Sequence, residues 1–174
     1  MCEAAVGDEH SFLVGGEKRC FSLWVPPNAA SPAPVALMHH GLDADAGQLC
    51  NNHFIAQAQE HGIALLCTQA LSGSWRFGRL PWAAEGSRES SSALGNACDD
   101  SDSADLAYMR QVYAYLHTRP TVLDPHRVFH IGYSQGALFA ACERGGAQTP
   151  LELAGVDLAP ILHVPPYDRR RLLL

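Results

Sequence analysis

The fold of this chain is decided by the sequence DPHRVFHIGYSQG, which covers residues 124–136. Asp124 and Pro125 predict a turn, and Arg127–Ile131 is expected to be a buried strand. The alanine-rich stretch Gln135–Cys142 predicts a helix directly afterwards. Residues 132–136 fit the pattern Gly-x-Ser-x-Gly, which has chemical meaning when it lies between a strand and a helix. The stretch therefore predicts a nucleophilic serine, Ser134, with an ordinary glycine turn as the alternative.

The motif requires glycine at positions 132 and 136 for a steric reason. The turn is so tight that the serine takes a strained backbone conformation, and side chains two positions before or after it would collide with the neighbouring strand and helix. The turn lifts the Ser134 hydroxyl above the sheet edge. It also aims the N-terminus of the helix at the reaction centre, where backbone N–H groups favour negative charge. The amide of Gln135 is therefore a candidate oxyanion donor.

Outward from this motif, strand patterns alternate with helix patterns, which predicts an α/β fold with a mostly parallel sheet. Such sheets bind ligands beyond the carboxyl ends of their strands. The expected strands are Ser11–Val14, Arg19–Val25, Pro34–Met38, Ile63–Cys67, Arg127–Ile131 and a last one over Ala154–Leu162. The expected helices are Ala46–His61, Ser103–Leu116 and Gln135–Cys142. The first two strands predict a β-hairpin, joined by the turn residues 15–18.

A second candidate for the catalytic site is the loop that follows the strand ending at Met38. It consists of His39, His40, Gly41 and Leu42. A hydrolase with this serine motif needs a second N–H donor from a loop in this place. Gly41 permits close backbone approach, His40 supports the loop, and the amide of Leu42 is the candidate donor. The alternative is a metal held by both histidines, which is disfavoured because neighbouring side chains in an extended segment point to opposite faces.

Several segments together resemble one family, the secreted polyhydroxybutyrate depolymerase and feruloyl/acetylxylan esterase group of α/β-hydrolases. In chain order they are Arg19–Pro26, Leu37–Gly41, Gly73–Trp75, Cys98–Asp100 ahead of a helix at Asp105, and Asp124–Val128 with the serine motif. The resemblance covers about Phe12 to Cys142. This chain departs from the family pattern at two positions. It has Gln135 where the family usually has Ala or Asn, and Ala137 where the family often has a second glycine.

The resemblance implies the α/β-hydrolase fold, with this chain holding the N-terminal part of a mostly parallel sheet flanked by helices, and later strands missing. We expect a C-terminally truncated domain over residues 10–162 and an irregular tail over residues 163–174. The acid and base of the triad normally follow the serine in this fold. The residues after Ser134 are too few for two more βα units of about 30 residues each. His163, oriented by Asp157 or Asp168, is the remaining candidate base.

For function, the resemblance implies a serine carboxylic-ester hydrolase that acts through an acyl-enzyme on Ser134. Its substrate would be a small-molecule or polymeric ester, and no cofactor or metal is expected. Because a serine without an adjacent base is a poor nucleophile, we expect severely impaired turnover. Two alternatives stay open: a non-catalytic truncated α/β-hydrolase-like protein, and a small-molecule carboxylesterase or thioesterase. The family is mostly secreted, but Met1–His10 has no signal-peptide pattern, so the compartment is left open.

Composition and charge exclude other classes of protein. Apolar residues make up 47% and charged residues 17% of the 174 residues, which fits one globular domain. The formal net charge of −6 argues against a nucleic-acid partner, because phosphate binding requires a basic surface. The basic run Arg169–Arg171 is interpreted as a solvated tail. No apolar stretch reaches the roughly 18 residues of a membrane helix, so no membrane partner is expected. The composition does not indicate an oligomeric state.

The six cysteines include no Cys-x-x-Cys pair, which disfavours zinc-finger or thioredoxin-like chemistry. Cys20 and Cys67 lie in apolar runs and are interpreted as small buried hydrophobic residues. Cys50 and Cys98 lie in less apolar surroundings and are candidates to pair in an oxidising compartment.

Two further groups have both a functional and a structural interpretation. Trp75 and Trp82 fall in the long surface stretch Leu71–Asp102, where they either stack on a sugar or aromatic acyl group or cover the edge of the core. A set of acidic residues resembles a calcium loop, but the glycine and distal glutamate of an EF-hand are absent. Favourable charges at a helix N-terminus explain the set better. Its members are Asp99, Asp100, Asp102 and Asp105.

Overall fold

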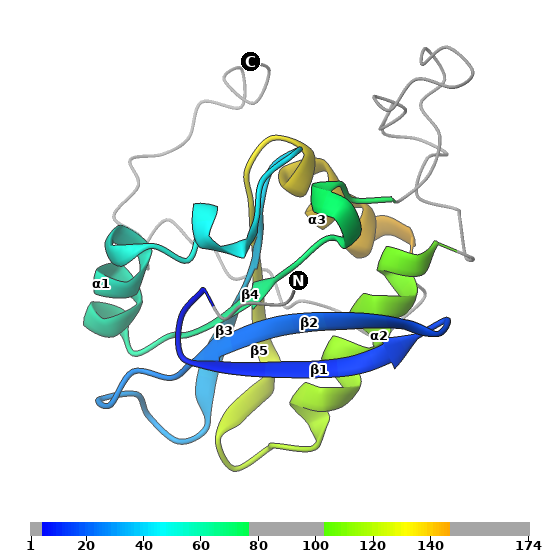
Figure 1. The fold of residues 1–174 in the computed structure, drawn as a ribbon. Helices are drawn as coiled ribbons and strands as arrows, with labels where there is room; N and C mark the ends of the chain where they lie inside the picture. The colour runs from blue at the N-terminus through cyan, green and yellow to red at the C-terminus, as the bar shows by residue number, and fades with distance from the viewer. Residues whose placement is uncertain (1–4, 77–102, 147–174) are drawn as a thin grey trace, which may run out of the picture.

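The computed structural model describes residues 5–76 and 103–146, and five strands in these ranges form one sheet with the order β1-β2-β4-β3-β5 (Figure 1). Neighbours β1–β2 and β2–β4 are antiparallel, whereas β3 is parallel to both β4 and β5. The strands are β1 (Asp8–Val14), β2 (Glu17–Trp24), β3 (Ala33–His39), β4 (Ala64–Thr68) and β5 (Leu123–Gly132). The expected α/β fold is confirmed, and the N-terminal hairpin makes the described sheet a mixed one. The strand expected over Ala154–Leu162 lies outside the described residues.

The hairpin turn is shorter than expected. Gly15 and Gly16 take φ angles of 58° and 84°, a left-handed conformation that glycine adopts without steric cost. Glu17 and Lys18, expected in the turn, are already part of β2 and pair with Val14 and Leu13. The hairpin itself is confirmed.

The helices are α1 (Asn52–His61), α2 (Ala104–His117) and α3 (Gln135–Gly146), with short 3-10 turns η1 (Ala46–Gln48) and η2 (Leu71–Gly73). The single helix expected over 46–61 is wrong, because the Asn51 side chain accepts hydrogen bonds from the His53 and Phe54 amides and starts α1 anew. The expected end is confirmed, since Gly62 caps α1 with a φ of 66°.

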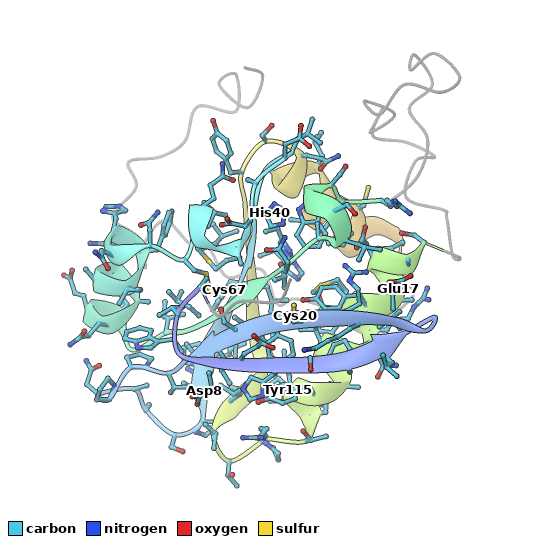
Figure 2. All side chains as sticks on the ribbon, in the orientation of Figure 1. Asp8, Glu17, Cys20, His40, Cys67 and Tyr115 are labelled. Atoms are coloured by element: carbon cyan, nitrogen blue, oxygen red, sulfur yellow. A yellow bond between two sulfur atoms is a disulfide. The ribbon has the colours of Figure 1, made fainter. Side chains whose placement is uncertain are left out.

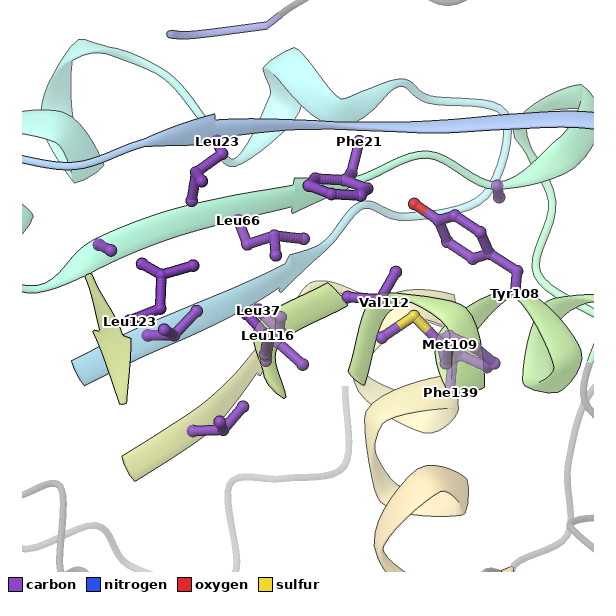
Figure 3. Close-up of a cluster of buried hydrophobic side chains, with 14 of the residues drawn as sticks. Phe21, Leu23, Leu37, Leu66, Tyr108, Met109, Val112, Leu116, Leu123 and Phe139 are labelled. Atoms are coloured by element: carbon purple, nitrogen blue, oxygen red, sulfur yellow. The ribbon is translucent and has the colours of Figure 1, made fainter. Parts of the chain in front are cut away.

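Helices cover both faces of the sheet, as the alternation along β3 shows. Val35 and Leu37 belong to the core cluster that includes α2 and α3, whereas Ala36 and Met38 belong to the cluster that includes η1 and α1. Figure 3 shows the first cluster, with sheet side chains such as Leu66 facing α2 and α3. None of the described helices is long and apolar enough to cross a membrane.

The turn expected at Asp124 and Pro125 is wrong, because both residues lie within β5. There the register with β3 shifts between Ala33 and Val35, so that the pairs are Ala33–Leu123 and Val35–Val128. The extra residues form an irregularity in which the Arg127 side chain donates to an Asp124 carboxylate oxygen at 2.6 Å.

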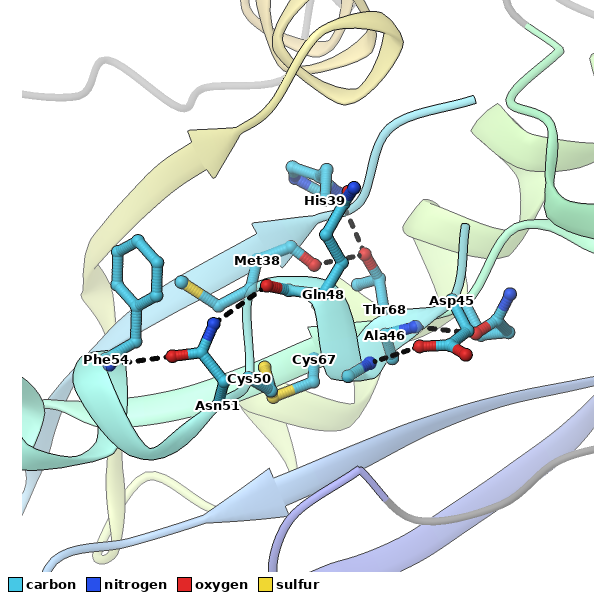
Figure 4. Close-up of a disulfide and its surroundings, with 12 residues drawn as sticks. Met38, His39, Asp45, Ala46, Gln48, Cys50, Asn51, Phe54, Cys67 and Thr68 are labelled. Atoms are coloured by element: carbon cyan, nitrogen blue, oxygen red, sulfur yellow. Dashed lines mark hydrogen bonds between the residues drawn. A yellow bond between two sulfur atoms is a disulfide. The ribbon is translucent and has the colours of Figure 1, made fainter. Parts of the chain in front are cut away.

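A disulfide joins Cys50 to Cys67, with the Cα atoms 6.1 Å apart (Figure 4). It connects the segment between η1 and α1 to β4, and both cysteines are buried. Cys20 and Cys142 are also in disulfides. Cys20 and Cys67 are buried, as interpreted, but the interpretation missed that both are disulfide-bonded, and the candidate pairing of Cys50 with Cys98 is wrong. The error has a clear reason, since burial and disulfide bonding both favour an apolar setting for cysteine.

Candidate functional site

Ser134 lies at the junction between β5, which ends at Gly132, and α3, which begins at Gln135. Its φ of 51° is positive, an unusual and strained conformation for a residue with a side chain. The serine is exposed to solvent, and so is the ring of Tyr133 before it. The junction thus has the sharp bend that the sequence pattern predicts for a nucleophile.

The two glycines of the motif are required by close backbone contacts. A Cβ atom added to Gly132 would lie 2.4 Å from the backbone of Gly136 and Ala137. One added to Gly136 would lie 2.1 Å from the His39 carbonyl oxygen and 2.4 Å from that of His40. These distances are far below van der Waals contact. The start of α3 can therefore rest on the end of β3 only because Gly136 lacks a side chain, and it can follow so closely on β5 only because Gly132 lacks one.

The loop after β3 lies against the serine bend. The Tyr133 amide donates to the His39 carbonyl at 3.1 Å, and the Gly41 amide donates to the Gln48 side-chain oxygen at 2.6 Å. The amides of Leu42 and Gln135, the two candidate oxyanion donors, take no part in the backbone hydrogen bonds of the described turns and loops. Both amides therefore have the donor capacity that the prediction needs.

His40 is a buried, neutral support of this loop. The Ala70 amide donates to its Nε2 at 3.0 Å, so the proton sits on Nδ1, which donates to the Gly41 carbonyl at 2.7 Å. Burial lowers the pKa of His40, against an opposing effect of the hydrogen bond to Gly41. Figure 2 shows His40 at the upper end of the sheet. Both ring nitrogens are occupied by loop contacts, which fits a supporting role.

His39 points to a different set of partners. Thr68 donates its hydroxyl proton to the Met38 carbonyl at 2.8 Å, so its oxygen accepts from His39 Nδ1 at 2.9 Å. His39 Nε2 then accepts from His130 Nδ1 at 3.1 Å, and His130 Nε2 accepts from the Tyr113 hydroxyl at 2.7 Å. This series of hydrogen bonds connects β4, β3 and β5 to α2, so His130 faces the helix that covers this side of the sheet.

Trp75 belongs to the core and is only 2% exposed. Its ring stacks on Phe139 of α3, with the ring centroids 4.4 Å apart, and its Nε1 donates to the His40 carbonyl at 2.8 Å. The interpretation of Trp75 as a stacking surface for a sugar or acyl group is therefore wrong, and its structural alternative is confirmed. Trp82 lies outside the described residues.

Asp105 lies in the first turn of α2, as expected, but its main partner is a charge from the hairpin. Its carboxylate forms an ion pair with Arg19 of β2, and both side chains are buried. Arg19 also donates to the carbonyls of Ala104 and Gln69, and its guanidinium lies 4.2 Å from the centre of the Tyr108 ring. Burial raises the pKa of Asp105, while Arg19 acts in the opposite direction. The other three acidic residues of that set, at 99, 100 and 102, lie outside the described residues.

Sequence reasoning missed the roles of two glutamine side chains at the site, those of Gln48 and Gln135. Gln48 accepts from the Gly41 amide, and the buried side chain of Gln135 contacts Ser74 and Trp75. The one available signal was that Gln135 departs from the residues usual in the resembled family. The buried ion pair of Arg19 with Asp105 was also missed. Its signal was a charged residue within an otherwise apolar strand, since a buried charge needs a partner.

The candidate base and acid of a triad, His163 with Asp157 or Asp168, lie outside the described residues. Within residues 5–76 and 103–146, the Ser134 hydroxyl forms no hydrogen bond with a histidine. The same ranges hold no group of three or more histidine, cysteine, aspartate or glutamate residues that could bind a metal ion.

No family model matches this chain, and no curated protein matches it by sequence. Solved structures do match it. A poly(3-hydroxybutyrate) depolymerase from Bordetella parapertussis matches with a TM-score of 0.54 at 17% identity, over 77% of this chain and 45% of that one. An acetyl xylan esterase from Aspergillus awamori matches with a TM-score of 0.50 at 14% identity, over 75% of this chain and 44% of that one. An S-formylglutathione hydrolase from Staphylococcus aureus matches with a TM-score of 0.50 at 14% identity, over 75% of this chain and 48% of that one.

The chain therefore has the α/β-hydrolase fold, as the sequence motifs predict. Its neighbours in structure are hydrolases and esterases, and the bend at Ser134 has the strand–turn–helix form described above. The chain spans about half the length of these solved structures.

Proposed function

We propose that this protein is a serine carboxylic-ester hydrolase whose nucleophile is Ser134. The observation that carries the proposal is the bend itself: a serine with a φ of 51° between β5 and α3, flanked by two glycines where no Cβ atom fits. Proteins retain such backbone strain at places where it has a role. An ordinary glycine turn, the alternative interpretation, has no need of a strained, exposed serine at its apex.

In the proposed reaction, the Ser134 oxygen attacks the ester carbonyl, and the Leu42 and Gln135 amides donate to the oxyanion that forms. The alcohol leaves, the acyl group stays on Ser134, and water then releases the acid. The position of Gln135 at the N-terminus of α3 supports this role, because free amides and the helix dipole favour negative charge there. His40, Gly41, Gly132 and Gly136 would hold the two donors in place.

The proton of Ser134 needs an acceptor, and this limits the proposed activity. Removing the base from a serine triad lowers turnover by roughly a million-fold, while binding and the oxyanion donors leave roughly 10³–10⁴ over water. We propose that Ser134 in residues 1–174 is an acceptor-deficient nucleophile with severely impaired turnover. The alternative is that His163, oriented by Asp157, serves as its base.

The substrate class is proposed from the likeness to a poly(3-hydroxybutyrate) depolymerase and an acetyl xylan esterase. We expect an ester of a hydroxyalkanoate, or a feruloyl or acetyl ester of a carbohydrate. A small-molecule carboxylesterase or thioesterase is the second candidate, favoured by the presence of an S-formylglutathione hydrolase among the structural neighbours.

A fluorophosphonate probe tests the proposal, because it bonds to a serine that is both nucleophilic and served by oxyanion donors. We expect labelling of the protein that is lost in Ser134→Ala and retained in Ser72→Ala, a matched change at another exposed serine with a positive φ, 57°. Absence of Ser134-dependent labelling would instead support a non-catalytic α/β-hydrolase-like protein. Hydrolysis of hydroxybutyrate oligomers, acetylated xylan and a thioester, compared at equal labelled protein, then separates the substrate classes.

A further inference from the structure

The side chain of Gln135 is buried although the bend that it follows is exposed. Only 5% of Gln135 is accessible to solvent, whereas Ser134 beside it is exposed. An amide group is costly to bury unless both its oxygen and its nitrogen find hydrogen-bond partners. The hydrogen-bond partners of the Gln135 side chain therefore indicate its role.

Both ends of this amide bind one loop. The Gln135 oxygen accepts from the Trp75 backbone amide at 3.0 Å, and its nitrogen donates to the Ser74 hydroxyl at 3.2 Å. The loop is 60 residues away along the chain. The side chain thus fastens the start of α3 to the segment that follows β4.

The same segment is fastened to the loop after β3. The Trp75 ring donates to the His40 carbonyl at 2.8 Å, and the Asp43 amide donates to the Gly73 carbonyl at 2.9 Å. Leu42 lies between these two attached residues, His40 and Asp43. A short series of hydrogen bonds therefore leads from Gln135 through Trp75 to the backbone on either side of Leu42.

We propose that the Gln135 side chain is a positioning residue that sets the spacing between the two oxyanion donors, the amides of Leu42 and Gln135. This inference rests on the proposed function, because it assigns the side chain a task in the same reaction. The backbone amide of Gln135 binds the oxyanion, and its side chain, acting through Trp75, holds the opposite donor at the matching distance. An oxyanion site depends on such fixed geometry, since its donors must already point at the charge when it develops.

Loss of the Gln135 side-chain hydrogen bonds should weaken the binding of the transition state and leave the binding of the substrate unchanged. A purely structural role would not separate the two. Loss of a whole oxyanion donor costs about 10²–10³ in kcat. Both donors remain when only their spacing relaxes, so we expect a smaller loss, roughly tenfold. The ground-state ester carries no full negative charge on its oxygen, so KM should stay nearly unchanged.

The test uses the full chain with p-nitrophenyl acetate, and kcat is expressed per Ser134 labelled by a fluorophosphonate. Gln135→Met keeps the length of the side chain and removes its hydrogen bonds. Trp75→Phe keeps the backbone amide and an aromatic ring but removes the bond to His40. We expect each variant to lower kcat about tenfold with KM within twofold, and the double variant to lose little more than either one. Gln59→Ala, an exposed change on α1, serves as the control and should match the unmodified protein.

Four results would overturn the positioning role. Unchanged kcat per labelled serine in Gln135→Met, or fully additive losses in the double variant, would overturn the positioning role while leaving the proposed function intact. A large rise in KM alone would assign Gln135 to substrate binding and would also overturn it. An unmodified protein that neither hydrolyses the ester nor labels at Ser134 would remove the proposed function itself, and the positioning role with it.

Discussion

The guanidinium group of Arg19 on β2 and the carboxylate of Asp105 on α2 form a buried ion pair, with side-chain exposures of 2% and 1%. The second carboxylate oxygen accepts from the Arg76 amide at 2.5 Å. The pair therefore joins the hairpin, the first turn of α2 and the chain just after Trp75. It lies in the core of the described fold, where an unpaired charge would be very costly.

Substitution of Asp105 by Asn should destabilise the protein strongly. Removing one partner of a buried ion pair leaves the other charge uncompensated, at a cost of about 3–5 kcal/mol. Urea unfolding measures this loss. The double variant Arg19→Met with Asp105→Leu removes both charges and should lose less than Asp105→Asn alone. A double variant less stable than the single one would show that hydrogen bonds, rather than charge, dominate at this pair.

Gly136→Ala should abolish the chemistry at Ser134. The added Cβ atom would lie 2.1 Å from the His39 carbonyl oxygen, so the start of α3 must move away from β3. We expect at least a hundredfold loss of fluorophosphonate labelling, the size of effect seen when oxyanion geometry is lost. Gly47→Ala is the matched control, because the nearest atom to its Cβ is the movable Asp45 side chain at 3.0 Å. Equal labelling of both variants would contradict the steric account.

The disulfide between Cys50 and Cys67 should contribute measurably to stability. Its loop spans 17 residues, and closing a loop of about 15 residues in the unfolded chain is worth about 3 kcal/mol. The double variant Cys50→Ala with Cys67→Ala should lower the free energy of unfolding by about this amount. Thermal unfolding without reductant measures the change, while the other disulfides stay intact. An unfolding midpoint equal to that of the unmodified protein would show that the bond is dispensable.

Stability should fall as the pH drops below the ordinary pKa of histidine, and His40 should account for part of the fall. Burial lowers the pKa of His40 in the folded protein, so the unfolded chain binds the proton more readily. The stabilisation is complete above about pH 6.5 and is lost as the pH falls towards the lowered value, by at most about 1.4 kcal/mol per pH unit.

Urea unfolding between pH 7.5 and 5 measures this slope. His40→Gln should show a shallower slope than the unmodified protein, since glutamine does not titrate. The pKa of His10 is also lowered by burial, and its contribution is the same in both proteins and cancels from the comparison. Identical slopes would mean that His40 is not the group responsible.

Much of the fold was predictable because its signals are local. The hairpin, β3, β4, α2 and the bend at Ser134 follow from apolar runs, helical periodicity and glycines within a few residues. The break before α1 was missed because the apolar spacing from Leu49 to Ala58 looks continuous, whereas Asn51 starts the helix there through its side-chain hydrogen bonds. The shift of register within β5 depends on its pairing with β3, which no local pattern reveals.

The amino-acid sequence alone was sufficient to indicate a strained serine between a strand and a helix, since the two glycines and the serine lie within five residues. Only the folded chain decided which distant groups meet: Gln135 with Trp75 across 60 residues, Arg19 with Asp105 across 86, and Cys50 with Cys67 across 17. The reason is physical. A bend is set by the conformational limits of its own backbone, whereas a buried polar or sulfur contact depends on how whole strands and helices pack against each other.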